Sequence, residues 1–320
     1  MNKNILNILA HRIINMIISL VVAFSLIYFL VYSAPGKQFY YILNPNIDEL
    51  LIQKMVSEQS LSTAVEFNEF VKKIFAGNLG SSTRYHQNIS NLIFEHIQVT
   101  FILSITAFIL QFIISLFLAY VTLKHKGKLF DRIMDKSTSV LYSLPTIVTA
   151  PFLIILFSVV LKLFPTSGLS NFSGKSDFID RIYYLTLPVL SLVLSFIPEY
   201  YKYLVEILEN LSNQNFIVYL KSLSVSRLNI FFKHIVPNSM NTILSIIGVD
   251  LGLLLSGSLI TEIIFGIPGF GRLTYEAIWT KDYYLAISCG MYGATIFILM
   301  NFITDILRVF IDKRAIASLR

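Results

Sequence analysis

Cysteine is almost missing from this chain of 320 residues, in which Cys289 is the only one. No disulfide can therefore form within the chain, and the fold has to be held together without covalent cross-links. Charge is scarce as well, because Asp, Glu, Lys and Arg together make up 14% of the residues. In soluble domains roughly a quarter of all residues are charged, so this deficit argues against a soluble protein.

Motifs for phosphate binding and for hydrolytic catalysis are also missing. No G-x-x-x-x-G-K-[ST] loop is present, so any ATP that drives this protein has to be hydrolysed by another chain. There is no H-E-x-x-H motif and no Ser–His–Asp pattern. Gly266, Gly269 and Gly271 imitate part of a dinucleotide fingerprint, but no strand precedes them and Pro268 interrupts the run. We interpret them as a tight external turn, and expect no enzyme activity, no catalytic residue, no metal site and no cofactor in this chain.

Apolar residues, by contrast, are abundant: they make up 55% of the chain, with 26 Phe and 17 Tyr. A helix needs roughly 20 apolar residues to cross a bilayer. Six segments meet that length, and they predict an all-α, polytopic membrane protein with six transmembrane helices: Ile13–Tyr32, Ile97–Leu123, Val140–Leu163, Tyr184–Leu204, Thr242–Phe265 and Leu285–Phe310. The first could be a signal peptide, but it is too long and lacks an A-x-A cleavage site, so we expect an uncleaved helix.

Lys and Arg residues indicate the orientation, because cytoplasmic loops carry an excess of them. With the N-terminus inside, the two short external loops hold only Lys162, Lys175, Arg181, Arg272 and Lys281. The cytoplasmic side then holds three times as many: Lys3, Arg12, Lys124, Lys126, Lys128, Arg132, Lys136, Lys202, Lys221, Arg227, Lys233, Arg308, Lys313, Arg314 and Arg320. The pattern predicts that both termini are cytoplasmic. It also explains the net charge of +6 without a nucleic-acid partner.

The chain divides into three parts on this interpretation. Residues 1–33 form the N-terminal segment and first helix, residues 34–96 a partly helical external loop or cap, and residues 97–320 a five-helix core. His86 and His96, with Glu95, could suggest a metal site near the second span. We interpret these side chains as interfacial.

The polar interval of about residues 204–238 keeps helical periodicity between two spans. Phe216, Tyr219, Leu220 and Leu223 repeat at i, i+3, i+4 and i+7, which predicts one apolar face of a short helix. Ser226 is then a candidate N-cap for a second helix that carries Leu228, Phe231 and Phe232, and Pro237 is expected to end it. Two such helices at the cytoplasmic surface suit the docking of a separate motor subunit. The alternative is a pair of helices that lies on lipid headgroups.

Several short motifs resemble the permease subunit of bacterial peptide and nickel ATP-binding-cassette (ABC) importers, on the B-type side of the usual pair. The family's G-x-L-G-x-S turn resembles Ala76–Ser82, its S-L-P resembles Tyr142–Pro145, and its external P-x-S-G turn resembles Phe164–Gly168. The run TEIIFGIPGFGRL is similar to the family's E-x-x-F-x-x-P-G-x-G-x-L, and Asn301 and Asp305 to its closing N-x-x-x-D.

The resemblance implies the fold of a type I ABC importer permease in the bacterial plasma membrane. It implies a pore-forming subunit that works with a second permease, two cytoplasmic ABC ATPases that bind ATP and Mg²⁺, and an external solute-binding lipoprotein. The expected solutes are short peptides first and nickel or a metal chelate second.

The family's ATPase-coupling "EAA" segment corresponds to the polar interval. The residues that it implies for coupling are Phe216, Tyr219, Leu220, Leu223, Ser224, Val225, Ser226, Arg227, His234 and Pro237. The chain departs from the pattern at Ser224, where the family has glycine, and at Leu220, where it has alanine. A serine can take the left-handed turn expected there at a cost of roughly 1 kcal/mol. Lys313 also replaces a proline in the tail.

Asp250, Glu262 and Asn301 are the candidate residues of the translocation pathway. A carboxylate within a span is costly, and it usually lines a cavity or meets a partner. For Asp250, the pathway, a hydrogen bond to another subunit and pairing within this chain all remain open. An acidic group there would suit a cationic solute. Glu262 is typical of the family and suits a structural brace for the GIPGFG turn better.

Two other classes of function stay open from the residues alone. A secondary transporter or channel would be driven by ion gradients, but inverted repeats and broken helices are not evident in the sequence. A membrane-embedded enzyme would need a catalytic cluster, which the motifs above do not supply.

Overall fold

The structure is a computed structural model, which describes residues 3–33, 72, 79–169 and 178–311. The described residues fold into helices joined by short turns, and the one β-bridge among them joins Ser81 to Asn88. The long helices are α1 (Lys3–Ser33), α5 (Ile89–Lys124), α8 (Phe178–Ser212), α11 (Val236–Leu255) and α14 (Tyr283–Ile311). The shorter ones are α6 (Leu129–Tyr142), α7 (Thr146–Leu153), α9 (Asn215–Ser222), α10 (Arg227–Ile230), α12 (Leu259–Ile264) and α13 (Phe270–Trp279), with two π-helical segments, η1 (Ile154–Val160) and η2 (Phe231–Ile235).

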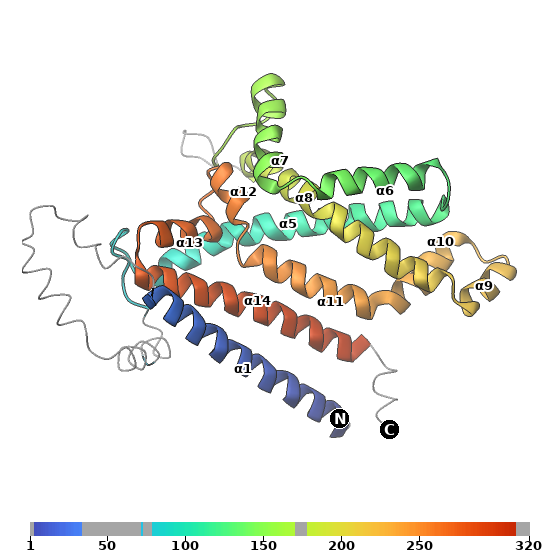
Figure 1. The fold of residues 1–320 in the computed structure, drawn as a ribbon, viewed down its shortest axis with the longest axis horizontal. Coiled ribbons are helices and arrows are strands. Elements are labelled where there is room, and N and C mark those ends of the chain that lie inside the picture. Colours follow the sequence, from blue (N-terminus) through green and yellow to red (C-terminus); the bar gives the residue numbers. More distant parts are fainter. Residues whose placement is uncertain (1–2, 34–71, 73–78, 170–177, 312–320) are drawn as a thin grey trace, which may run out of the picture.

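The long helices form an elongated bundle (Figure 1). Five helices are long and apolar enough to cross a membrane, or six if the bent pair made by residues 129–142 and 146–160 counts as one span. This confirms the predicted all-helical, multi-span fold. The second long helix, α5, has 36 residues and starts at Ile89, before the predicted start at Ile97. It therefore includes the end of the predicted external loop. Most of that loop, residues 34–71 and 73–78, lies outside the described residues.

Both ends of the described chain point the same way. The first turn of α1 and the last turn of α14 lie toward the side of the bundle that carries α9 and α10, while α13 lies at the other side (Figure 1). Arg12 on α1 joins Asp305 on α14 through a 2.6 Å ion pair near that side. This arrangement agrees with an even number of crossings, as the predicted orientation requires.

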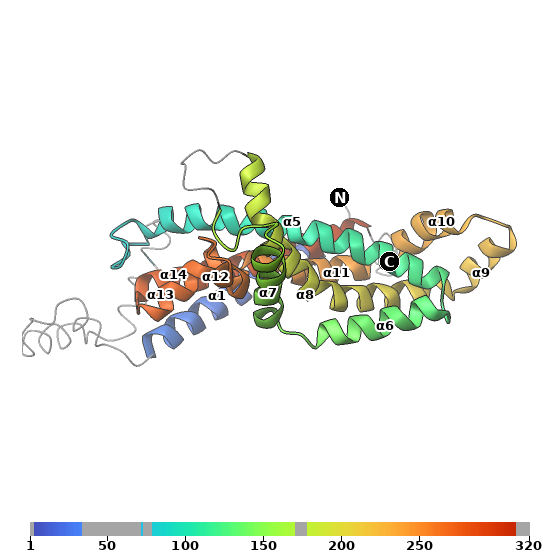
Figure 2. The same ribbon diagram turned by 90° about the horizontal axis from the view of Figure 1, so that it is seen from above.

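The third span is not the single helix Val140–Leu163 that the sequence predicted. The chain bends by 100° between α6 and α7, and α7 projects sideways from the bundle (Figures 1 and 2). The cause is Pro145, which forms the N-cap of α7 and disfavours helical backbone at the residue before it. The absence of broken helices, which weighed against a secondary transporter, was therefore a wrong expectation.

The second break concerns the predicted fifth span, Thr242–Phe265. Here α11 ends at Leu255, and α12 starts only at Leu259, after a turn in which Gly257 has a φ of 129°. The Glu262 end of the predicted span therefore belongs to a separate short helix at the outer turn.

The helices α11 and α14 pack closely against one another. Gly248 and Gly252 are one turn apart on α11 and face α14. A Cβ atom added to Gly248 would lie 2.1 Å from Thr304 Oγ1, and one added to Gly252 would lie 2.7 Å from the Phe297 ring. Small residues allow membrane helices to approach this closely, and their packing replaces the hydrophobic effect that lipid does not supply. Asp250 lies between the two glycines in sequence, about 200° around the helix from each, so it points away from α14.

Candidate functional site

The polar interval between α8 and α11 folds as the short helix α9 followed by α10. Phe216, Tyr219 and Leu223 are exposed on α9, at 38%, 63% and 56%, so three of the four predicted face residues are open to a partner. Leu220 instead packs, with Val225, against the buried Ile217 and Phe231. The side chain that anchors α9 is Ile217, which is fully buried. Periodicity could not distinguish the anchored edge of this face from its free edge.

The turn after α9 has a left-handed residue at the position where the family has glycine. Ser224 has a φ of 58°. Its N–H donates to the Lys221 carbonyl over 3.1 Å, and the Val225 N–H donates to the Leu220 carbonyl over 3.3 Å. These two hydrogen bonds make a Schellman motif, which closes the carbonyl end of the helix. Ser224 keeps the turn that glycine would form more readily.

The second loop helix begins as predicted but does not end where predicted. The Ser226 hydroxyl accepts a hydrogen bond from the Asn229 N–H, which makes Ser226 the N-cap of α10. Pro237, however, does not stop the helix, because α10 continues through η2 directly into α11. In η2 an N–H donates to the carbonyl five residues earlier, as the Val236 N–H does to the Phe231 carbonyl. A π-turn accommodates the missing N–H and the ring of the proline that follows.

An aromatic contact holds the loop to the bundle, and an ion-pair cluster holds together the helix ends beside it. Phe231 stacks edge-on against Tyr120 near the end of α5, with ring centroids 4.9 Å apart. On the other side, Lys126 Nζ lies 2.8 Å from Glu209 Oε2 on the last turns of α8, and 4.0 Å from Asp131 Oδ2 on α6. The hydrogen bond to Glu209 raises the pKa of Lys126. Lys126 therefore links three helices directly before α9 begins.

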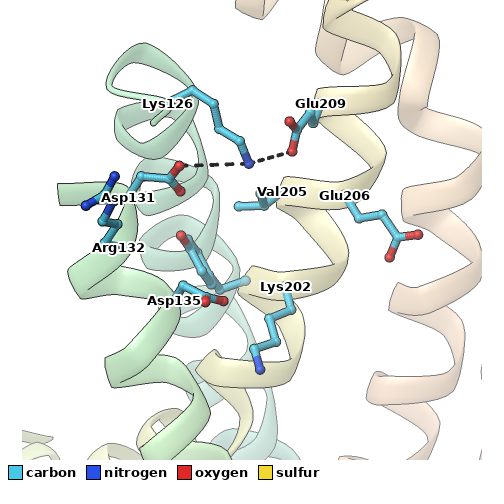
Figure 3. A pocket seen from close by; sticks show the side chains of 9 residues that line it. Lys126, Asp131, Arg132, Asp135, Lys202, Val205, Glu206 and Glu209 are labelled. Carbon is cyan, nitrogen blue, oxygen red and sulfur yellow. Dashed lines mark hydrogen bonds and ion pairs between the residues drawn. The ribbon is translucent and has the colours of Figure 1, made fainter. Parts of the chain in front are cut away.

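A charged cleft of about 450 Å³ surrounds this ion pair. Figure 3 shows Lys126 between the two carboxylates, while Glu206 points away from them. The cleft is lined by Lys126, Asp131, Arg132, Asp135, Tyr201, Lys202, Val205, Glu206 and Glu209. From the sequence, the basic residues here indicated only the topology. Their pairing with acidic residues on a helix about 80 positions later could not be read from local spacing.

The opposite end of the molecule is organised around Glu262, whose side chain is fully buried. Its Oε1 accepts hydrogen bonds from the hydroxyls of Thr100 (2.8 Å) and Ser258 (3.0 Å), and its Oε2 accepts from the Arg272 N–H (2.8 Å). Thr100 also accepts the Phe270 N–H. Gly269 is needed here, because a Cβ atom would lie 2.4 Å from the Glu262 carboxyl carbon. Glu262 thus ties α5, α12 and the GIPGFG turn together, as the brace that its sequence context favoured.

A second buried carboxylate at this end fixes the segment before α5. Asp282 is 1% exposed. It accepts hydrogen bonds from the Ser82 hydroxyl (2.7 Å) and the Thr83 N–H (2.9 Å), and it caps α14 at Leu285. Asp282 was not among the residues predicted from the sequence, although its place directly before Tyr283, the first residue of α14, is a capping signal.

Glu276 on α13 completes the outer network. It pairs with Arg272 Nε at 2.8 Å and accepts the Tyr85 hydroxyl. Burial by itself would raise the pKa of Glu276, but the hydrogen bonds from Tyr85 and Arg272 outweigh it and hold that pKa below its usual value. Burial, together with the bond to Glu276, raises the pKa of Tyr85 to about 12. The outer turn is therefore fixed by carboxylates at three positions.

The remaining predicted site residues lie apart from one another. Asn301 donates from Nδ2 to the Phe297 carbonyl of its own helix, on the side of α14 that meets α11. Asp250 is partly exposed and faces away from α14, so the two do not form one site. His234 is half-buried, with its carbonyl accepting from Asn238, while Arg227 and Pro237 are exposed. His96 Nδ1 hydrogen-bonds with the Leu92 carbonyl.

Comparisons with known proteins agree with this architecture. The family model "Binding-protein-dependent transport system inner membrane component" matches residues 111–317. The chain is 24% identical to the oligopeptide transport system permease protein AppB of Bacillus subtilis, over 88% of this chain and 90% of that one. It is 26% identical to the dipeptide transport system permease protein DppB of Lactococcus lactis, over 93% and 95%.

A metal-chelate permease and a solved transporter structure also resemble this chain. The metal-staphylopine import system permease protein CntB of Staphylococcus aureus is 24% identical over 84% of each chain. A solved structure of the MetNI methionine ABC transporter in an inward-facing conformation matches 70% of this chain and 96% of its own, with a TM-score of 0.54 and 15% identity. That identity shows a shared fold only. Because the family model covers well over half of the sequence, this chain belongs to the inner membrane components of binding-protein-dependent transport systems, multi-pass permease proteins of the bacterial plasma membrane.

Proposed function

We propose that this chain is a pore-forming permease subunit of an ATP-driven importer of short peptides. The observation that carries the proposal is the loop helix α9, which presents an exposed apolar face at the end of the bundle where both described chain ends lie. Membership of the transport family supports it, as do the relatives AppB and DppB, which are named for oligopeptide and dipeptide transport. The relative CntB, named for metal-staphylopine import, supports a metal chelate as the second candidate solute.

The proposed partners follow from the family. They are a second permease, two cytoplasmic ABC ATPases and an external solute-binding lipoprotein. The ATPases would bind ATP and Mg²⁺, and this chain would contribute neither an ATPase site nor a cofactor. The family name, which specifies dependence on a binding protein, supports the external partner.

ATPase movement would reach the bundle through the contacts of the loop and of the helix ends beside it. A movement of the ATPases would push on Phe216, Tyr219 and Leu223. Since α10 runs without a break into α11, that push would reach the bundle interior directly. Lys126 would carry it to α6 and α8 through its two ion pairs. Leu220, Ser224, Val225, Ser226, Arg227, His234 and Pro237 would shape the loop and its contact rim.

The proposed pathway keeps one of the three sequence candidates. Asp250 is partly exposed and turned toward α8. Glu262 and Asn301 satisfy their hydrogen bonds within the chain and would act as structural residues.

Reconstitution tests the proposal. The complex that co-purifies with the tagged chain would be placed in proteoliposomes with the binding protein outside, and uptake of labelled trialanine would be followed with and without ATP in the lumen. We expect uptake only with ATP, and co-purification of two ATPase subunits. Uptake that follows an imposed proton or sodium gradient without ATP would overturn the proposal in favour of a secondary transporter.

A further inference from the structure

Four polar side chains gather at one depth inside the bundle. Counting 1.5 Å per residue, Gln111 lies about 20 Å from the Lys124 end of α5, Glu199 about 20 Å from the Ser212 end of α8, and Asp250 about 21 Å from the Val236 end of α11. Those three ends lie together, because Lys126 and Tyr120 contact Glu209 and Phe231 there. Tyr200 shares this depth, because its ring packs on Phe108 and Phe112 on either side of Gln111.

Two of these groups are buried without hydrogen-bond partners. Gln111 is fully buried, and neither its amide nitrogen nor its oxygen has a partner. Tyr200 is 2% exposed and its hydroxyl also has none. An unpaired polar group in the interior of a membrane protein costs several kcal/mol. The Tyr200 hydroxyl interacts electrostatically with the Asp250 carboxylate, which places the two groups near one another.

The two carboxylates lie at the open edge of this layer. Glu199 is exposed and Asp250 partly exposed, and they repel one another electrostatically. No ion pair among the described residues involves either one. The nearby cation Lys202 turns to α6 instead, where Nζ bonds the Ser139 hydroxyl and lies over the Tyr142 ring. Two acids at this depth without a basic partner among the described residues cannot face lipid cheaply, and their charge favours a cationic occupant or partner.

Aromatic groups define the chemistry of that occupant. Tyr203, 45% exposed, lies one turn after Glu199 on α8, and the two side chains interact electrostatically. Tyr142 from α6 is 59% exposed and lies within electrostatic range of Tyr203. Carboxylates beside tyrosine rings suit an ammonium or guanidinium group, which gains from both the charge and the ring faces. Imidazole is a ligand that suits nickel, and this set contains no imidazole.

We propose that Glu199 and Asp250, with Tyr203 at the rim and the Tyr200 hydroxyl behind them, form a site in the translocation pathway that recognises the cationic groups of basic peptides. This inference rests on the proposed function and specifies its substrate class. Pro198 adds a further acceptor to the site. Because proline has no backbone N–H, the carbonyl of Leu194, one turn earlier on α8, lacks its usual helical donor.

Uptake by the whole reconstituted complex tests the site. Asp250→Asn, Glu199→Gln and the double variant would be compared with the parent for labelled trilysine, trialanine and Ni²⁺. We expect each single variant to lower the trilysine-to-trialanine uptake ratio about tenfold and the double variant to lower it further, because a carboxylate attracts a cation far more strongly in a low-dielectric cavity than in water. The matched control is Glu95→Gln, which removes an exposed charge from the outer turns of α5 and should leave the ratio unchanged.

The outcomes separate this inference from the function it rests on. A parent complex that transports none of these peptides would overturn the proposed function. Transport of trialanine with an unchanged ratio in all variants would overturn only the cationic site. Loss of the second permease from the purified variants would show that the carboxylates bind that subunit, and loss of Ni²⁺ uptake alone would assign them to a metal. Either result would overturn the basic-peptide assignment.

Discussion

A carboxylate without access to water has to be matched by donors, and Glu262 meets that need with two hydroxyls and one backbone N–H. Its donors come from α5, from the residue before α12 and from the start of α13, so one side chain holds the outer turn together. Each donor left without its acceptor in a buried site costs about 1–3 kcal/mol. The residue therefore matters more for stability than for contact with solute.

We predict that Glu262→Ala lowers the free energy of unfolding by at least about 3 kcal/mol, because it leaves Thr100, Ser258 and the Arg272 N–H unpaired. Glu262→Gln should cost less, since it keeps one acceptor oxygen. Thermal unfolding of the purified complex would measure both. The control is Glu206→Gln, an exposed residue on α8, which should not change the transition. An alanine variant as stable as the parent would contradict the brace.

At the scale of the element, the loop helix α9 has a fixed edge and a free edge. Ile217 and Leu220 hold it to the bundle, while Leu223 stays 56% exposed with no role in that packing. An exposed leucine at a free edge suits docking, because burying such a side chain in a partner stabilises a complex by roughly 1.5–3 kcal/mol.

We predict that Leu223→Asp weakens ATPase binding at least tenfold and abolishes ATP-dependent uptake, while the chain still inserts and folds. The reason is that the variant places a charge in an apolar contact without disturbing Ile217. Co-purification of the ATPases and uptake would be measured together. Asn213→Asp introduces the same charge at an exposed position before α9 and should have little effect. Normal ATPase binding by Leu223→Asp would remove the docking assignment.

The second prediction at this scale concerns the contact between α11 and α14. Gly248→Ala would force a Cβ atom against Thr304, so the two helices would have to separate, and we expect a lower unfolding temperature. Thr304→Ala should partly rescue it, because the atom at 2.1 Å is the threonine hydroxyl oxygen. Gly293→Ala is the control, since its nearest atoms lie at 3.7 Å. Additive effects of Gly248→Ala and Thr304→Ala would show that the contact is not made.

At the scale of the whole molecule, the testable property is orientation. We predict that a cysteine at Gln87, an exposed residue of the outer network, reacts with an impermeant thiol reagent added outside intact cells. A cysteine at Ser222, exposed at the end of α9, should react only after permeabilisation. The buried Cys289 gives a low background in both experiments. The opposite labelling pattern would reverse the orientation that Lys and Arg predict.

The amino-acid sequence by itself determined the membrane class, the all-helical fold and the place of two short helices between the fourth and fifth predicted spans. These features depend on local composition and periodicity, which the sequence contains. Only the tertiary structure decided the break at Pro145, the continuation of α10 through Pro237, the donors that surround Glu262 and the separation of Asp250 from Asn301. Each of these depends on which distant groups meet. A proline ends a helix or is absorbed by a π-turn according to its surroundings, and a carboxylate is a brace or a binding group according to the donors that tertiary packing brings to it.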